Sequence, residues 1–205
     1  MKKAAVLLDG SFVQKVLQRQ LRKPPTAEET VHFAKACVEG SEELFRIYYY
    51  DCPPFGLTRT KPISNEEVDF AATPLFNQQT AFQNKLSCMD HIAFRKGMLS
   101  FKGWKIGPYA IKHLMKNPRQ VQAQDLVPDL KQKRVDMKIG LDIAWLSSKS
   151  IVERIILVTG DADFIPAMKF ARREGVQVVL VTLGNPIKEE MKHHVDIFRT
   201  VNWQP

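Results

Sequence analysis

The sequence predicts an α/β fold in which helices cover both faces of a mostly parallel central sheet. Two observations lead to this prediction. Short continuous apolar runs, such as residues 4–8 and 155–159, are typical of strands that are buried on both faces. Helix-length segments separate several of these runs, and crossovers of that kind join parallel neighbours in a sheet.

The expected elements follow one another in a regular order at both ends of the chain. The first strand ends at Asp9-Gly10, and a break at Pro24-Pro25 separates the two helices that follow it. The expected strands are 4–8, 46–50, 155–159, 176–182 and 197–201, and the expected helices are 12–21, 27–39, 133–148 and 164–174, with a short one opening at Asn185-Pro186.

Two of the expected helices carry further signals. Helix 164–174 has Asp163 in position to cap its first turn and Gly175 just past its last. Helix 133–148 presents an apolar face to the core. The residues expected on its buried side are Val135, Ile139, Ile143 and Leu146, and Trp145 is also most simply a core residue.

The middle of the chain does not follow this alternation. Residues 66–72 and 76–95 are expected to be helical, the second because Phe82, Leu86, Met89 and Ala93 recur at helical spacing. Residues 101–109 are expected to form a strand. We interpret residues 53–130 as an elaboration on a single domain that spans residues 1–205.

Composition excludes several classes of protein. With 44% hydrophobic and 25% charged residues, the chain is neither disordered nor collagenous, and no apolar run is long enough for a membrane span, so no membrane partner is expected. Three cysteines without C-x-x-C spacing support neither a zinc knuckle nor a disulfide framework, and cytoplasmic localisation is expected.

The positive charge is concentrated in one segment. The formal net charge is +8, and residues 95–138 contain eleven Lys and Arg but only three Asp. Outside this segment the two signs balance. A localised basic segment favours a polyanionic partner more than a basic pI alone does.

Acidic residues follow three of the buried-type strands. Asp9, Asp51 and the pair Asp161 and Asp163 stand where these strands end, and Asp136 stands at the start of a helix. Ligands of open parallel sheets bind outside the carboxyl ends of the strands. A single Asp after a strand is more often a turn former or a cap, and Asp51, which precedes Cys-Pro-Pro, is interpreted that way.

Several carboxylates at one sheet edge require a positive charge between them. Mg²⁺ or Mn²⁺ is the expected cofactor, because hard divalent cations prefer oxygen ligands. Such an ion can polarise a phosphoryl oxygen and activate water for in-line attack on phosphorus. Asp163 could act both as a helix cap and as a ligand.

Three blocks of sequence resemble the NYN domain, in the LabA-like branch of the PIN-like nuclease superfamily. They are the apolar strand ending in Asp9-Gly10-Ser11, the segment from Gln132 to Asp142 with Val135-Asp136 and Leu141-Asp142, and Gly160-Asp161-Ala162-Asp163-Phe164. The resemblance implies a Rossmann-like three-layer α/β/α sandwich and a metal-dependent endoribonuclease. It assigns the catalytic and metal-binding roles to Asp9, Asp136, Asp161 and Asp163, with Asp142 as a further matching position.

The chain departs from the family pattern at three positions. Phe12 stands where many relatives have Asn, Arg134 replaces the usual Gly before Val-Asp, and Ala162 replaces Ser. None of these changes removes a carboxylate. Ser11 could take over a contact of the missing Asn, although a hydroxyl beside a tight turn is more often a local hydrogen-bond partner.

Basic residues close to Asp136 in sequence are expected to bind RNA, which is the expected partner. A strand that interleaves Lys with Phe101, Trp104 and Tyr109 could stack unpaired bases, but the simpler interpretation of Trp104 is packing on the core side of an edge strand. For the run 131–134, phosphate binding and a merely solvated charge run are equally favoured. The expected nucleic-acid-binding residues are Ser11, Lys102, Lys105, Lys131, Lys133, Arg134 and Lys138.

The sequence leaves two functions in competition. The favoured one is a metal-dependent endoribonuclease that hydrolyses single-stranded or looped RNA. The alternative is a catalytically weak or inactive NYN-domain protein that binds RNA as a regulator. A phosphatase with an aspartyl nucleophile at Asp9 is disfavoured, because Gly10-Ser11 leaves no second Asp to act as the acid. The sequence does not decide between a monomer and a homodimer.

Overall fold

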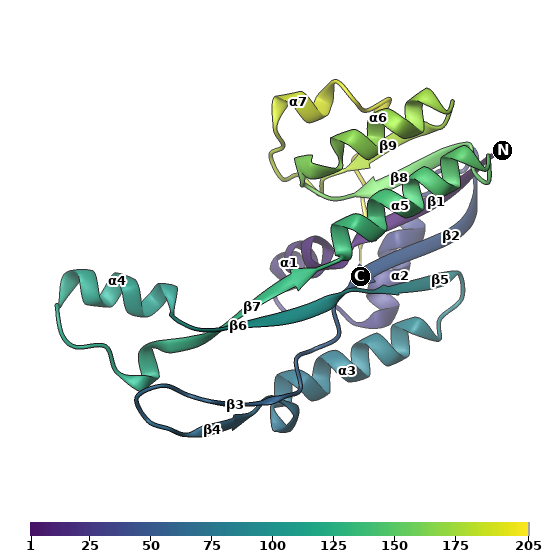
Figure 1. The fold of residues 1–205 in the computed structure, drawn as a ribbon. Helices are drawn as coiled ribbons and strands as arrows, with labels where there is room; N and C mark the ends of the chain where they lie inside the picture. The colour runs from purple at the N-terminus through teal and green to yellow at the C-terminus, as the bar shows by residue number, and fades with distance from the viewer. Residues whose placement is uncertain (205) are drawn as a thin grey trace. The chain divides into compact units, whose positions relative to one another are not determined.

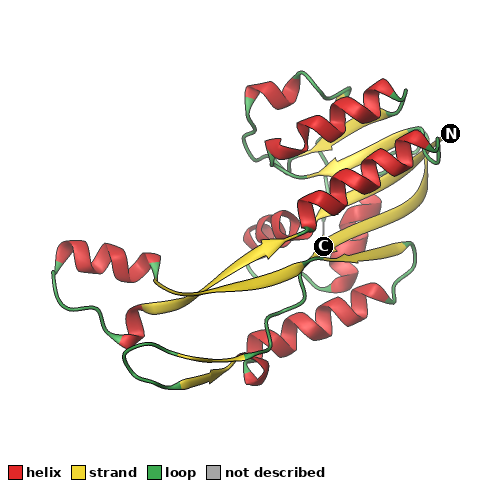
Figure 2. Cartoon of the chain, viewed as in Figure 1, coloured by secondary structure: helices red, strands yellow, loops and turns green. Residues whose placement is uncertain are grey.

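The computed structural model describes residues 1–204, which contain a six-stranded parallel sheet and two small antiparallel hairpin sheets (Figures 1 and 2). The strand order of the large sheet is β10-β9-β8-β1-β2-β5, and every neighbouring pair in it is parallel. Its strands are β1 (Lys2–Asp9), β2 (Glu42–Asp51), β5 (Ile92–Lys96), β8 (Arg154–Val158), β9 (Gln177–Val181) and β10 (Ile197–Phe198).

Helices cover both faces of this sheet, as the sequence predicts. The helices are α1 (Gly10–Leu21), α2 (Ala27–Ala36), α3 (Pro74–Ser87), α5 (Val135–Ser148), α6 (Ile165–Arg173) and α7 (Glu189–Lys192). Val13 and Leu17 of α1 and Phe33 of α2 share one core cluster with Val6 and Leu8 of β1. Strand residues alternate in direction, so the intervening residues of β1 face the opposite layer, where α5 contacts β1 and β2 and packs against α6. The α/β fold class is therefore confirmed.

The chain divides into two compact units. The first consists of residues 1–51, 82–97 and those from 134 onward, and it contains the large sheet. The second consists of residues 52–81 and 98–133. It holds the antiparallel pairs β3 (Thr58–Thr60) with β4 (Glu67–Asp69) and β6 (Met98–Ile106) with β7 (Leu126–Lys133), besides α4 (Pro108–Lys116) and two 3₁₀ turns at 70–72 and 123–125.

A buried ion-pair network ties the C-terminal segment to the sheet. Glu42, at the start of β2, accepts hydrogen bonds from Arg154 on β8 and from Arg199, whose Nη1 and Nη2 lie 2.8 Å from the two carboxylate oxygens. All three residues are buried. Burial raises the pKa of Glu42, but the hydrogen bonds from Arg199 and Arg154 outweigh burial and hold this pKa at about 2.

Most predicted elements at the two ends of the chain are present, and the middle differs. Residues 66–72 form β4 and a 3₁₀ turn rather than a helix. The predicted helix 76–95 ends at Ser87, because His91 adopts a left-handed backbone with φ of 64° and the chain then enters β5. The apolar spacing of Phe82 and Leu86 is helical, but Ala93 lies on a strand.

Three smaller expectations also need correction. Asp161, not Asp163, caps the turn before α6, since its side chain accepts the Asp163 amide. The short C-terminal helix begins at Glu189, three residues after Pro186. Trp145 is 49% exposed on α5, whereas the four residues predicted on the buried side of that helix are indeed buried. Among the described residues, every helix is too short or too polar to cross a bilayer.

Candidate active site

The predicted acids lie in the first unit, on three separate segments of the chain. Two of these segments are the carboxyl ends of adjacent strands, and the third is the start of a helix. Asp9 is the last residue of β1, and Asp161 and Asp163 lie in the turn that follows β8. β1 and β8 pair in parallel, so both strands deliver these residues to the same edge of the sheet. Asp136 comes from the first turn of α5.

Asp9 is held by three hydrogen bonds. Its Oδ1 accepts the Ser11 hydroxyl at 3.0 Å and the Phe12 amide at 3.3 Å, and its Oδ2 accepts the Thr159 hydroxyl at 3.3 Å. The bond from the Phe12 amide caps the start of α1. Burial raises the pKa of Asp9 above its ordinary value, although the three hydrogen bonds act in the opposite direction.

Gly10 allows Asp9 and α1 to sit against β2. A Cβ atom at this position would lie 2.5 Å from the backbone oxygen of Tyr50 and about as close to the Tyr49 ring, at 2.9 Å. Any other residue would push the start of α1 away from the sheet. Close packing at the start of α1 therefore requires the glycine that follows Asp9 in the sequence.

Thr159 links the acids of the two strands. Its buried hydroxyl donates to Asp9 and accepts the backbone amide of Asp161 at 3.2 Å, and Asp161 in turn accepts the Asp163 amide at 3.0 Å. The sequence prediction missed this residue, because a Thr at the end of an apolar run is indistinguishable from any other β-branched strand residue.

Asp136 is electrostatically coupled to the other three acids. Burial raises the pKa of Asp136, and the negative charges of Asp9, Asp161 and Asp163 raise it further. None of these four carboxylates forms an ion pair with a Lys, Arg or His among residues 1–204. The structure thus gathers the four predicted acids into one uncompensated negative region.

The backbone conformation of Arg134, two residues before Asp136, explains why the resembling family prefers glycine there. Arg134 occupies the N-cap of α5 with φ of 70° and makes no capping hydrogen bond through its side chain. This left-handed conformation favours glycine, the residue that the resembling family usually has there. Arg134 adopts it under strain, so the substitution affects the backbone that leads into Asp136 and leaves the carboxylate in place.

Phe12 has a packing role at the position where many relatives have Asn. Its ring lies against the turn after β8, since a Cβ atom at Gly160 would be 3.0 Å from the Phe12 ring. Phe12 also packs against the core cluster. It therefore packs against the turn that carries Asp161 and offers no polar group to the site.

Asp142 is in a different environment from the other four acids. Its Oδ2 accepts hydrogen bonds from the Tyr50 hydroxyl and from Arg95 Nε, each at 2.9 Å. The Arg95 guanidinium also lies 5.2 Å from the centre of the Tyr48 ring. The Asp142 carboxylate is therefore neutralised by Arg95. It belongs with Arg95 and Tyr50 and not with the four acids that lack a cationic partner.

The four acids have the oxygen ligands that a divalent cation prefers, but they do not form a complete ligand set by themselves. Among residues 1–204, no three His, Cys, Asp or Glu side chains lie close enough together to hold a metal ion by themselves. The donor chemistry fits Mg²⁺, which keeps several waters and commonly takes only one or two carboxylates together with substrate phosphates. A site completed by water and phosphate is thus compatible with this arrangement, whereas a protein-only cage is not.

The predicted RNA-binding residues fall into both units. Lys102, Lys105 and Lys131 surround Asp129 in the second unit, where Lys105 Nζ lies 2.6 Å from Asp129 Oδ1 and all three lower the pKa of Asp129. Lys133 is exposed at the end of β7. Arg134, Lys138 and Ser11 belong to the first unit, and the Ser11 hydroxyl is engaged with Asp9.

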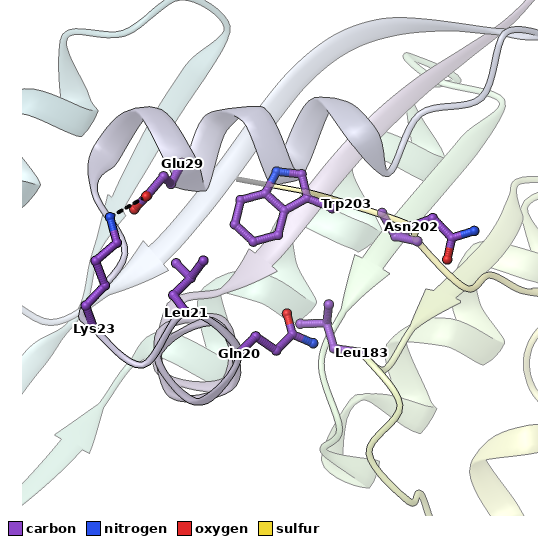
Figure 3. A pocket seen from close by; sticks show the side chains of 8 residues that line it. Gln20, Leu21, Lys23, Glu29, Leu183, Asn202 and Trp203 are labelled. Atoms are coloured by element: carbon purple, nitrogen blue, oxygen red, sulfur yellow. Dashed lines mark hydrogen bonds and ion pairs between the residues drawn. The ribbon is translucent and has the colours of Figure 1, made fainter.

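One pocket lies away from all of these residues. It has a volume of about 660 Å³ and lies beside the end of α1, with Leu21 and Leu183 opposite the Trp203 ring and the Lys23–Glu29 ion pair at one side (Figure 3). The Trp203 ring is fixed by edge contacts with Phe33 and by a hydrogen bond from its Nε1 to His32 Nδ1. The sequence prediction gave no indication of this pocket.

Fold and site together define an α/β protein with an acidic edge on a parallel sheet. A family model, that of the NYN domain, matches residues 102–202, just under half of the chain, and the matched segment contains Asp136, Asp161 and Asp163. NYN domains are generally nuclease-like, so the match supports the resemblance found in the sequence.

The fold comparison is consistent with this. The structure is similar to a crystal structure of a protein of unknown function from Vibrio parahaemolyticus, with a TM-score of 0.52 and 16% identity. The similarity covers 98% of this chain and 93% of that chain, and at this identity it shows the fold alone. No curated protein matches the sequence.

Proposed function

We propose that the protein is an NYN-domain ribonuclease of the LabA-like branch, which uses Mg²⁺ or Mn²⁺ to hydrolyse phosphodiester bonds in single-stranded or looped RNA. The observation that carries this proposal is the uncompensated group of Asp9, Asp136, Asp161 and Asp163 at the carboxyl edge of a parallel sheet. We place the activity in the cytoplasm, since the cysteine pattern favours a reducing compartment.

The four carboxylates are suited to a cation because they repel one another without it. When bound, a divalent cation supplies polarisation of a phosphoryl oxygen and activation of a water molecule. Asp136 and Asp9, with pKa values raised by burial, become more readily ionised beside a positive charge. The hydrogen bonds from Ser11, Phe12 and Thr159 hold the Asp9 carboxylate in one orientation, and Thr159 and the capping bond of Asp161 hold the adjacent turn.

The test is cleavage of mixed single-stranded and hairpin RNA in Mg²⁺ or Mn²⁺. Asp136→Asn is the most informative variant, because the Asp136 side chain forms no hydrogen bond within residues 1–204, and Asp161→Asn is a second one that retains a capping oxygen. We expect both variants to lose cleavage by about a hundredfold or more and to keep RNA binding. Equal cleavage by wild type and both variants, or cleavage that persists in EDTA, would overturn the proposal.

A second candidate is an RNA-binding regulator that does not cleave. Phe12 favours it, since this side chain packs against Gly160 where many relatives have an amide. The lack of a three-ligand group among residues 1–204 points the same way. RNA binding that survives EDTA, with no turnover in either ion, would establish this function in place of the first.

A further inference from the structure

A bulge in β6 places two aromatic side chains on the same face of the second unit. Phe101 pairs with Leu130 and Trp104 pairs with Pro128, so two residues of β6, Lys102 and Gly103, stand opposite the single residue Asp129, and Gly103 has φ of 111°. On a regular strand, residues three apart would point to opposite faces. The bulge cancels this alternation and keeps Phe101 and Trp104 side by side, with ring centres 5.9 Å apart.

Two further rings from the other part of this unit complete an aromatic cluster. Phe55 stacks on Phe101 with ring centres 5.6 Å apart, and Phe70 lies 5.2 Å from Phe55 and 6.2 Å from Trp104. The Trp104 Nε1 donates a hydrogen bond to the Thr60 backbone oxygen at 2.9 Å. We call Phe55, Phe70, Phe101 and Trp104 the aromatic platform.

The platform is less buried than the aromatic core residues of the first unit. Each of its four rings is only half-buried, whereas Tyr48, Tyr49, Phe33 and Phe164 of the first unit have essentially no exposed surface. Part of each side chain of the platform therefore remains accessible to a ligand.

Two cations lie over the platform. The Arg59 guanidinium is 5.4 Å from the ring centres of both Phe55 and Phe101, and Lys61 Nζ is 5.9 Å from the Trp104 ring. Neither forms an ion pair with an acid in the described part of the chain. The unit as a whole carries nine Lys and Arg against five Asp and Glu.

We propose that the aromatic platform with Arg59 and Lys61 binds the unpaired bases of single-stranded RNA. Aromatic rings and guanidinium planes both stack on bases, and the same cations neutralise phosphates. A cationic ligand is excluded because Arg59 and Lys61 would repel it, and an acidic peptide would use the cations but not the rings. The inference deepens the proposed function, on which it rests for the choice of RNA, by naming a substrate-binding surface outside the acidic site.

The first experiment separates stacking from folding. Trp104→Leu and Trp104→Phe both lose the hydrogen bond to Thr60, but only the second keeps a ring. We expect Trp104→Leu to weaken binding of a labelled single-stranded RNA by about tenfold and Trp104→Phe to bind within about threefold of wild type. Equal loss in both variants, or no loss in either, would overturn the proposal. Thermal unfolding of both variants verifies that they are equally folded.

The second experiment uses a matched pair of arginines. Arg46, on β2 of the first unit, lies over the Phe45 ring at 5.0 Å and therefore makes the same kind of contact as Arg59. We expect Arg59→Gln to weaken single-stranded RNA binding by about fivefold to tenfold, with a smaller effect on a duplex of equal length, and Arg46→Gln to have no effect. Equal effects of the two substitutions, or equal losses for single strand and duplex, would indicate charge alone and contradict the proposal.

Both experiments are carried out in EDTA on an Asp136→Asn background, so they do not depend on cleavage. If the platform variants lose binding although the wild-type protein never cleaves RNA, the platform stands and the ribonuclease proposal fails. If cleavage depends on Asp136 but the platform variants bind normally, the platform fails and the ribonuclease proposal stands.

Discussion

Arg95 Nε lies 2.9 Å from Asp142 Oδ2, and this ion pair separates Asp142 from the four acids that have no cationic partner. Asp142 also accepts the hydroxyl of Tyr50, which is buried. A carboxylate held by an arginine and a tyrosine stabilises the packing of α5 on β2 and β5. It is poorly placed to serve a divalent cation as well.

We therefore expect Asp142→Asn to reduce stability and to leave metal-dependent cleavage largely intact. The loss should be about 1 kcal/mol, since Arg95 is partly exposed and solvent screens the pair. Urea unfolding and RNA cleavage, each compared with Asp136→Asn, measure the two effects. Loss of cleavage in a well-folded Asp142→Asn protein would return Asp142 to the catalytic group.

Asp136→Asn should make the metal-free protein more stable near pH 7. The pKa of Asp136 is raised in the folded state, so the folded protein binds this proton more tightly than the unfolded chain does. The stability that this proton provides is present below the ordinary pKa of 3.8 and is lost as pH rises through the folded-state pKa. The variant escapes that loss, and its melting temperature should rise by about 2–4 °C for each kcal/mol of repulsion removed.

Asp129→Asn is the matched control for this effect. The pKa of Asp129 is lowered, first by its hydrogen bond from Lys105, so neutralising it removes an attraction instead of a repulsion. Melting curves from about pH 8 down to about pH 3, below the ordinary pKa of 3.8, should separate the two variants. A gain in stability for Asp129→Asn, or none for Asp136→Asn, contradicts the electrostatic assignment.

Millimolar Mn²⁺ should raise the melting temperature of the wild-type protein in the absence of RNA. A ligand that binds only the folded state stabilises it by RT ln(1 + L/Kd), where L is the free ligand concentration. The rise should be smaller in Asp136→Asn and in Asp161→Asn, and Asp142→Asn should respond like wild type. An identical rise in all four proteins would place the ion elsewhere.

Gly10 and Gly140 should respond oppositely to alanine. A Cβ atom at Gly10 meets the Tyr50 backbone at 2.5 Å, whereas nothing lies within 4 Å of one at Gly140 in α5. Gly10→Ala should be destabilising by about 1–3 kcal/mol, and Gly140→Ala should be stabilising by up to about 1 kcal/mol through helix propensity. Chemical denaturation measures both. A stabilising Gly10→Ala would show that α1 can move away from β2 at little cost.

Glu42→Gln should cost about 3–5 kcal/mol, because it leaves the buried Arg154 without a carboxylate and leaves the buried Arg199 with only the exposed Glu39. Glu189→Gln, which breaks an exposed pair with Lys192, should leave the stability almost unchanged. The folded-state pKa of Glu42 is about 2 against an ordinary 4.5, so its stabilisation is present above the ordinary value and is lost as pH falls through about 2. Urea unfolding from neutral to acid pH should show a steeper acid loss for wild type than for Glu42→Gln.

Much of the fold and the identity of the four acids could be predicted from local sequence. Runs such as residues 155–158 are buried on both faces, and their composition alone indicates this. The acids follow directly from strand ends and a helix start, which are local features. The end of α3 could not be predicted in this way. Apolar residues continue at helical spacing past the turn at residues 90–91, so the local pattern predicted a helix up to residue 95.

Only the tertiary structure decided which of these groups face one another. Asp136 is coupled to Asp9 across more than a hundred residues, Asp142 obtains Arg95 and Tyr50 from two strands, and Thr159 bridges two others. Likewise, the bulge at Lys102 and Gly103 reverses the face on which Trp104 would lie. Sequence periodicity fixes which side of its own element a residue occupies, but the electrostatic partner of a side chain depends on strand order and register. These arise from packing over the whole chain.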